Sequence, residues 1–192
     1  MKILIMFFLT GNFLFAQLPA FFDLDGYKNL KFGMGEEEAS GKITNYNLIL
    51  HADFFETIEL NKNSFLNIYK NDKDETAYYL YFHDNYLYRI EICNHIGYSY
   101  NNPIFSYPSE GSKIDDIKEK LIGEFGEVSK TDIKYYTFYD KPFEEYILWW
   151  TSDLVSISLY IKPDLETLDK TIKKYSYRIS FYDEIKIKKI HK

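Results

Sequence analysis

The chain has 192 residues, of which 46% are hydrophobic and 27% charged, and its formal net charge at pH 7 is −6. This balance excludes a disordered chain, and the acidic excess argues against a nucleic-acid partner, which would need clustered positive charge. A single cysteine excludes both a disulfide framework and a cysteine-rich zinc site.

The first sixteen residues have the order of a secretory signal peptide. Lys2 supplies a positive charge, an apolar run covers 3–9, and the small residue Ala16 precedes the polar Gln17. We therefore expect residues 1–16 to be cleaved and the mature chain to be secreted or periplasmic. The alternative is that this segment stays uncleaved as a membrane anchor, which needs about 20 apolar residues. We expect membrane contact only through this segment, and only if it is not cleaved.

The first half of the mature chain predicts a short helix followed by strands. The acidic run 36–38 favours a helix start, because negative charge there interacts favourably with the helix dipole. Gly41 should keep this helix short. Strand-like segments follow at 54–60, 64–70, 76–83 and 86–93.

The second half repeats this order. Ser112 suits a helix N-cap, and apolar residues recur at helical spacing until Gly123 and Gly126 end the pattern. A further helical pattern opens at Pro163, and the basic run 186–192 is interpreted as a solvated strand or tail. Strand-like segments lie at 133–139, 144–151, 154–161 and 175–183.

A helix followed by strands, twice, predicts an α+β fold rather than alternating parallel units. We expect two related modules, 17–106 and 107–192, with the boundary in the segment 101–108. Each module should contain a short helix followed by an antiparallel sheet of about four strands, with the helices on one face.

The strand segments also predict two hairpin registers. Asp84 and Asn85 tolerate positive φ and suit a two-residue turn, so residues whose numbers sum to 169 should pair. This register puts Ala77, Tyr79, Tyr81, Tyr88, Ile90 and Ile92 on one apolar face, and Tyr78, Leu80, Arg89 and Glu91 on the other.

In the second hairpin, a turn at Ser152 and Asp153 would pair Trp150 with Val155. Neighbouring residues of a strand point to opposite faces. Trp150 is therefore predicted to lie in the core, and Trp149 to be exposed on the solvent face.

That solvent face is the predicted partner-binding surface. By the same alternation it carries Trp149, Tyr160, Arg178 and Tyr182 among serines. Tryptophan, tyrosine and arginine are the residues that most often anchor protein interfaces. The alternative is that tyrosine occurs there because it suits strands.

Short motifs accompany this arrangement: Phe32 to Met34 before the acidic helix, and a second helix from Ile117 ending in residues 123–126. The arrangement resembles small secreted bacterial modules, above all the tandem repeats of the β-lactamase-inhibitor protein, and to a lesser degree the small outer-membrane lipoproteins of barrel assembly. The resemblance implies a concave aromatic sheet face that grips a partner enzyme, with contact roles for Trp149, Tyr160 and Tyr182. The inhibitor's repeats are each closed by a disulfide, which this chain cannot form.

The sequence offers little for catalysis. Cys93 and His95 are two potential metal ligands, but a zinc site needs three or four, and neither a nucleophile elbow nor a phosphate-binding glycine loop occurs. We therefore predict no catalytic residue, metal or cofactor, and a non-enzymatic protein that recognises a protein partner through its aromatic sheet face. The alternatives are a small secreted hydrolase that uses carboxylates or His95, and a structural component of the cell envelope.

Overall fold

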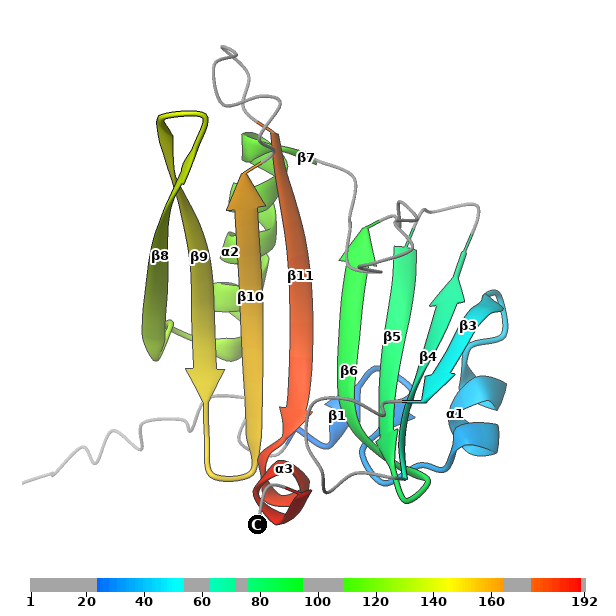
Figure 1. Ribbon diagram of the computed structural model, residues 1–192. Helices are drawn as coiled ribbons and strands as arrows, with labels where there is room; N and C mark the ends of the chain where they lie inside the picture. The colour runs from blue at the N-terminus through cyan, green and yellow to red at the C-terminus, as the bar shows by residue number, and fades with distance from the viewer. Residues whose placement is uncertain (1–23, 54–62, 72–75, 95–108, 164–173, 191–192) are drawn as a thin grey trace, which may run out of the picture.

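The computed structural model describes residues 24–53, 63–71, 76–94, 109–163 and 174–190. The expected signal peptide, the strand at 54–60, the module boundary at 101–108, the helical pattern after Pro163 and His95 lie outside the described residues. Within the described part the chain is mixed α+β, with three helices and mostly strands (Figure 1).

The elements are β1 (Gly26–Tyr27), β2 (Leu30–Lys31), α1 (Glu36–Lys42), β3 (Asn47–Asp53), β4 (Ser64–Lys70), β5 (Thr76–His83), β6 (Tyr86–Asn94), β7 (Ser109–Glu110), α2 (Gly111–Phe125), β8 (Lys130–Phe138), β9 (Lys141–Thr151), β10 (Val155–Pro163), β11 (Lys174–Asp183) and α3 (Glu184–Ile190).

Nine of the strands form one antiparallel sheet. Its order is β3-β4-β5-β6-β11-β10-β9-β8, with the short β7 added to β11, while β1 and β2 form a separate small ribbon. In each half of the chain one helix is followed by a run of four sequential antiparallel strands. The two runs meet where β6 pairs with β11, so the sheet is continuous (Figure 1).

The main core lies between the sheet and the two helices α1 and α2, which pack on the same face. Trp150 is fully buried there, as its alternation predicts, and its Nε1 donates a hydrogen bond to the carbonyl oxygen of Gly126 at 2.8 Å. This bond ties β9 to the end of α2. The other buried side chains of this core include Leu30, Ala39, Leu80, Phe82, Ile90, Leu121, Phe125, Ile157, Leu159 and Phe181.

A second group of apolar side chains is buried on the opposite face of β4, β5 and β6. Its members are Leu66, Ile68, Ala77, Tyr79, Tyr81 and Cys93. Burial raises the pKa of the Cys93 thiol, so it stays protonated and behaves as a small apolar residue. Strands β4, β5 and β6 are therefore buried on both faces.

The predicted register of the first hairpin is wrong beyond its turn. Asp84 and Asn85 do form the turn, with φ of 50° and 56°, and Phe82 pairs with Leu87. A β-bulge then inserts one extra residue into β6, so Tyr81 pairs with Arg89 instead of Tyr88. A shift of one residue exchanges the faces. Arg89 and Glu91 therefore lie beside Tyr79 and Tyr81, and Ile90 and Ile92 face the helices.

The second hairpin is also shifted, but by two residues. Trp150 pairs with Ile157 rather than with Val155, because the loop is longer and is closed by a hydrogen bond from the Ser152 N–H to the Val155 carbonyl oxygen at 2.9 Å. A shift of two leaves every side chain on its predicted face. The division into a core side and an outer side is therefore confirmed for β9, β10 and β11.

One terminal expectation is wrong, and one strand was not expected. The basic C-terminal run forms α3 instead of a strand or tail, because Asp183 accepts a hydrogen bond from the backbone N–H of Lys186 at 2.9 Å and so caps the helix. Strand β3 was not predicted, since a bulge between Leu48 and Leu50 interrupts its alternation. No helix in the described ranges is long and apolar enough to cross a membrane.

Candidate functional site

The four residues predicted to bind a partner lie on one face of the sheet. We call this face, opposite to α1 and α2, the outer face; it carries Trp149 on β9, Tyr160 on β10, and Arg178 and Tyr182 on β11. Tyr160 is directly opposite Arg178, while Trp149 is opposite Ser158. All four side chains are half-buried, so Trp149 is less exposed than its sequence position predicts.

The centre of the outer face is a carboxylate that sequence analysis did not single out. Glu91 on β6 is fully buried, and it forms ion pairs with Arg89 and, at 3.5 Å, with the Nε of Arg178. The hydroxyls of Tyr81 and Ser180 donate hydrogen bonds to it at 2.8 Å and 3.2 Å. Glu91 thus holds one guanidinium from each half of the chain across the β6–β11 junction.

Aromatic rings surround the two guanidinium groups. The guanidinium carbon of Arg89 is 4.5 Å from the ring centroid of Tyr81 and 4.9 Å from that of Tyr182. Arg178 lies in the same way over Tyr160, at 5.4 Å. Such cation–π contacts hold long arginine side chains in fixed positions.

Trp149 extends this array toward the edge of the sheet. Its ring lies 6.0 Å from that of Tyr182, and its Nε1 donates a hydrogen bond to the Asp132 carboxylate on β8 at 2.9 Å. Hydrogen bonds from Lys130 and, with a smaller effect, from Trp149 lower the pKa of Asp132. The indole is therefore fixed at one end by a ring and at the other by a carboxylate.

The pKa shifts in this array keep its groups in their ordinary protonation states near neutral pH. Burial, followed by the Glu91 carboxylate, raises the pKa of Tyr81, and burial together with a hydrogen bond to Glu145 raises that of Tyr160. Burial is the largest single influence on the pKa of Arg89 and lowers it, but the interactions with Glu91, Tyr81 and Tyr182 together exceed it, so the net shift is upward.

The outer face has the opposite charge balance to the whole chain, whose net charge is −6. By strand alternation, its described cations outnumber its described carboxylates by seven to three. The cations are Lys70, Arg89, Lys130, Lys134, Lys141, Lys162 and Arg178, and the carboxylates are Glu91, Asp132 and Glu145. The outer face is therefore a basic, aromatic surface on an acidic protein.

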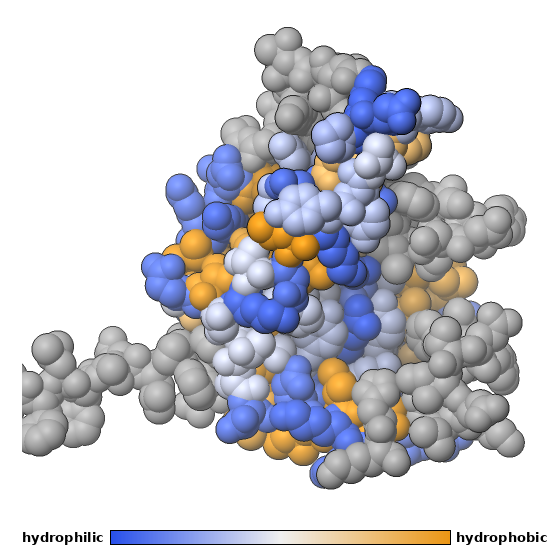
Figure 2. All heavy atoms as spheres, turned by 60° about the vertical axis from the view of Figure 1, so that its left-hand side comes forward, coloured by the Kyte–Doolittle hydropathy of each residue, from blue (hydrophilic) through white to orange (hydrophobic). Residues whose placement is uncertain are grey.

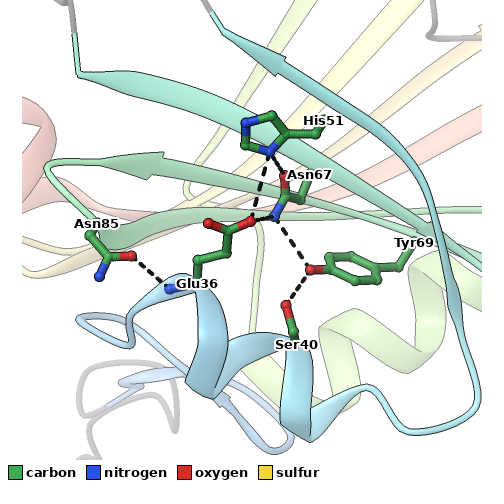
Figure 3. A network of polar contacts seen from close by, with 6 residues as sticks. All are labelled: Glu36, Ser40, His51, Asn67, Tyr69 and Asn85. Atoms are coloured by element: carbon green, nitrogen blue, oxygen red, sulfur yellow. Dashed lines mark hydrogen bonds and ion pairs between the residues drawn. The ribbon is translucent and has the colours of Figure 1, made fainter.

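A different polar cluster joins α1 to the other face of the sheet, next to β3 and β4 (Figure 3). The buried Asn67 is at its centre: its Nδ2 donates a hydrogen bond to Glu36 Oε1 at 2.8 Å, and its Oδ1 lies 2.6 Å from His51 Nδ1. The Glu36 carboxylate is also 3.7 Å from that histidine nitrogen. This arrangement satisfies the hydrogen-bonding groups of a buried amide.

Two further contacts in Figure 3 fix the helix itself. The backbone N–H of Glu36 donates a hydrogen bond to Asn85 Oδ1 at 2.8 Å, and Ser40 is hydrogen-bonded to Tyr69. The N-cap residue Gly35 has no side chain that could accept a hydrogen bond from the first turn of the helix. Asn85 of the β5–β6 turn provides the acceptor instead. We interpret this cluster as a tether that positions α1.

The described residues contain no group of three or more histidine, cysteine, aspartate or glutamate side chains that could hold a metal ion. Comparison of the chain with protein-family models, with curated proteins and with solved structures found no match. The interpretation of the site therefore depends on its own geometry and charge.

Proposed function

We propose that this chain is a non-enzymatic binding protein of the secreted or periplasmic space, and that it recognises a protein partner through the outer face. The observation that carries the proposal is the continuous array from Trp149 through Tyr182, Arg89, Glu91 and Arg178 to Tyr160. The array combines the three residue types that anchor interfaces on one surface.

The contacts within the array support a binding role through preorganisation. Ordering a flexible side chain at an interface costs about 0.5 to 1.5 kcal/mol. Here Glu91 and the tyrosine rings already hold the guanidinium groups in place, so less of this cost remains for the binding step. The buried serines 156, 158 and 180 are small, which leaves the larger rings and guanidinium groups as the contact groups.

The charge balance of the outer face supports an acidic protein as the partner. Complementary charge accelerates association and disfavours wrong partners. With seven described cations against three carboxylates, this face suits a protein surface that is acidic and carries apolar side chains between its carboxylates. Weaker capture at higher ionic strength is the expected signature, because salt screens such attraction.

The proposal includes the two-module organisation expected from the sequence, with modules 17–106 and 107–192. Two observations support it: each half contributes a helix followed by four sequential antiparallel strands, and the last strand of each run forms the junction. The outer-face array crosses that junction, because Arg89 and Glu91 come from the first half and Arg178 and Tyr182 from the second. In this arrangement, binding requires both modules.

The experiment is capture of envelope proteins by a tagged form of the protein and by two variants, Trp149→Ala and Tyr182→Ala. Both variants should keep most of the wild-type unfolding free energy and lose the captured partner. Tyr135→Ala is the matched control, since Tyr135 is an exposed aromatic residue on the side of the sheet that faces the helices. Equal capture by all four proteins would contradict the proposal. So would loss of the folded structure in the two outer-face variants, because it would show that Trp149 and Tyr182 belong to the core.

A further inference from the structure

A second aromatic site lies near the free end of the β8–β9 hairpin, apart from the outer-face array. A pocket of about 290 Å³ is formed there by β8, β9 and the adjoining ends of β10 and β11. Its lining includes five aromatic side chains, one carboxylate and two prolines. The residues that matter for its chemistry are Tyr135, Tyr136, Phe143, Glu144, Tyr146 and Tyr175.

Strand pairing explains why these side chains converge. Tyr135 is directly opposite Glu144 in the β8–β9 register, and Tyr146 is two residues further along β9, on the same side of the sheet. Tyr175, the second residue of β11, is opposite Pro163 at the end of β10. Tyr136 and Phe143 also line the pocket; by alternation they lie on the opposite face of the hairpin, where their rings are stacked with centroids 5.3 Å apart.

Glu144 is the single charged residue among the described residues that line the pocket. Its carboxylate accepts a hydrogen bond from the Tyr146 hydroxyl, which orients it. That hydrogen bond, followed by burial, raises the pKa of Tyr146 to about 12, so the phenol remains a donor at neutral pH. Among the side chains of the lining that the structure describes, none is cationic beside the negative charge of Glu144.

We propose that this pocket binds a small organic cation of the alkylammonium class, with the ammonium group against the tyrosine faces and next to Glu144. The face of an aromatic ring carries a negative quadrupole, and several rings around one cation form the usual recognition site for quaternary ammonium groups. The volume is near the lower end of the range for small-molecule sites, which suits a head group rather than a large ligand.

A second tyrosine-rich pocket in the molecule allows a comparison by charge. Its volume is about 240 Å³, and its lining includes Tyr27, Tyr46 and Tyr78. Its charged lining residues within the described ranges are Lys28 and Lys42, and none of the described lining residues is a carboxylate. Aromatic content alone is therefore common to both pockets, whereas the sign of the charge separates them. A cation should select the pocket that contains Glu144.

Figure 2 turns the β8 side of the molecule toward the viewer and shows hydrophobic, weakly polar and strongly hydrophilic side chains intermingled on it. This is not a broad apolar surface of the kind that marks a large protein interface. Within it, Tyr135 is 72% exposed, so a small ligand can reach its ring from solvent. The surface fits a local site for a small molecule.

The test uses choline and its neutral isostere 3,3-dimethyl-1-butanol, which has the same shape without the charge. Ligand-observed NMR titration of the full chain should give saturable choline binding, with the isostere about tenfold weaker or more. Glu144→Gln should weaken choline binding and bring it close to that of the isostere. Tyr135→Ala should weaken it as well, because the variant removes one ring of the site.

Two outcomes would overturn the inference: choline that does not saturate, or an isostere that binds as well as choline. Trp149→Ala separates this site from the proposed partner surface. That variant should lose partner capture and keep choline binding, whereas Glu144→Gln should do the reverse. If both variants lost both properties, the two sites would not be independent, and the assignment of a separate cation site would be wrong.

Discussion

Strands β5 and β8 share a high tyrosine content but lie in opposite environments. Both belong to the same antiparallel sheet and both are rich in tyrosine, yet Tyr79 on β5 is 1% exposed and Tyr135 on β8 is 72% exposed. Strand β5 pairs on both edges and is packed on both faces, whereas β8 is the last strand of the sheet. Tyrosine content therefore does not set burial; the position of the strand in the sheet does.

The edge position of β8 also explains its charges. An edge strand presents unpaired backbone groups to other chains, and charged side chains, lysine above all, discourage such pairing. Lys130, Asp132 and Lys134 alternate along β8 and serve this purpose. The central strands need no such protection, so β5 contains no charged residue between Ala77 and Phe82.

The largest effect on stability is expected from Phe82→Ala on β5. The Phe82 ring is fully buried and stacks on Phe65 with centroids 4.8 Å apart. Truncation leaves a cavity in a closely packed core, so the free energy of unfolding should fall by about 3 to 5 kcal/mol. Phe138→Ala on β8 is the matched control, with an expected loss of about 1 kcal/mol or less. Urea denaturation measures both, and equal losses would contradict the comparison.

Glu91→Gln should cost slightly less, about 3 kcal/mol, because it removes the charge that compensates Arg89 and Arg178. The substitution keeps the size of the side chain, so the loss is electrostatic rather than a packing defect. Adding Arg178→Met to this variant should recover part of the stability, since one uncompensated charge is then removed.

The control for Glu91→Gln is Glu119→Gln on the exposed surface of α2, which should change stability by about 0.5 kcal/mol or less. If Glu91→Gln left the unfolding free energy at the wild-type value, Glu91 would not be the centre of the array.

Asn67→Ala is expected to cost about 2 kcal/mol. The substitution removes a buried amide and leaves Glu36 and His51 without the hydrogen bonds that this amide supplies. Because this network positions α1, amide hydrogen exchange in residues 36–42 should also accelerate. Asn45→Ala, at an exposed position of the loop after α1, is the control and should leave exchange in the helix unchanged. Unchanged exchange in the Asn67 variant would show that the network does not hold the helix.

A smaller effect is confined to alkaline solution. Burial, followed by a hydrogen bond of 2.6 Å to Asp183, raises the pKa of Tyr86 to about 12. The folded state then holds this proton more tightly than the unfolded state, whose tyrosine pKa is about 10. The stabilisation is complete below pH 10 and is lost as the pH rises from 10 toward 12. Urea denaturation of wild type and Tyr86→Phe across this range should show a shallower decline for the variant; parallel declines would refute the assignment.

The two hairpins show how much of this sheet can be predicted from sequence. Alternation identified β4, β5 and β6 almost to the residue, and it assigned the side chains of β9, β10 and β11 to their faces. The error of two residues in the second hairpin did no harm, because side chains repeat every two positions. The error of one residue in the first hairpin reversed the faces beyond Tyr81.

That single bulge also explains why part of the site was missed. With the extra residue Tyr88 unrecognised, Arg89 and Glu91 were placed on the same face as Leu80 and thus away from Tyr81. No local residue pattern predicts the bulge, because Tyr88 is as compatible with a strand as its neighbours are. The pairing of β6 with β11 joins residues far apart in the chain, so the partners of Glu91 could be found only from the structure.

The smallest change is expected for Tyr135→Ala, and this result matters most for interpreting the others. Since Tyr135 is 72% exposed, truncating its side chain leaves no buried cavity and should change the unfolding free energy by about 0.5 kcal/mol or less. A loss above about 1 kcal/mol in urea denaturation would mean that β8 is packed like a central strand, contrary to its position at the edge. Retained stability has a further consequence: any loss of choline binding by this variant must then come from the missing ring, because the fold that carries the pocket is intact.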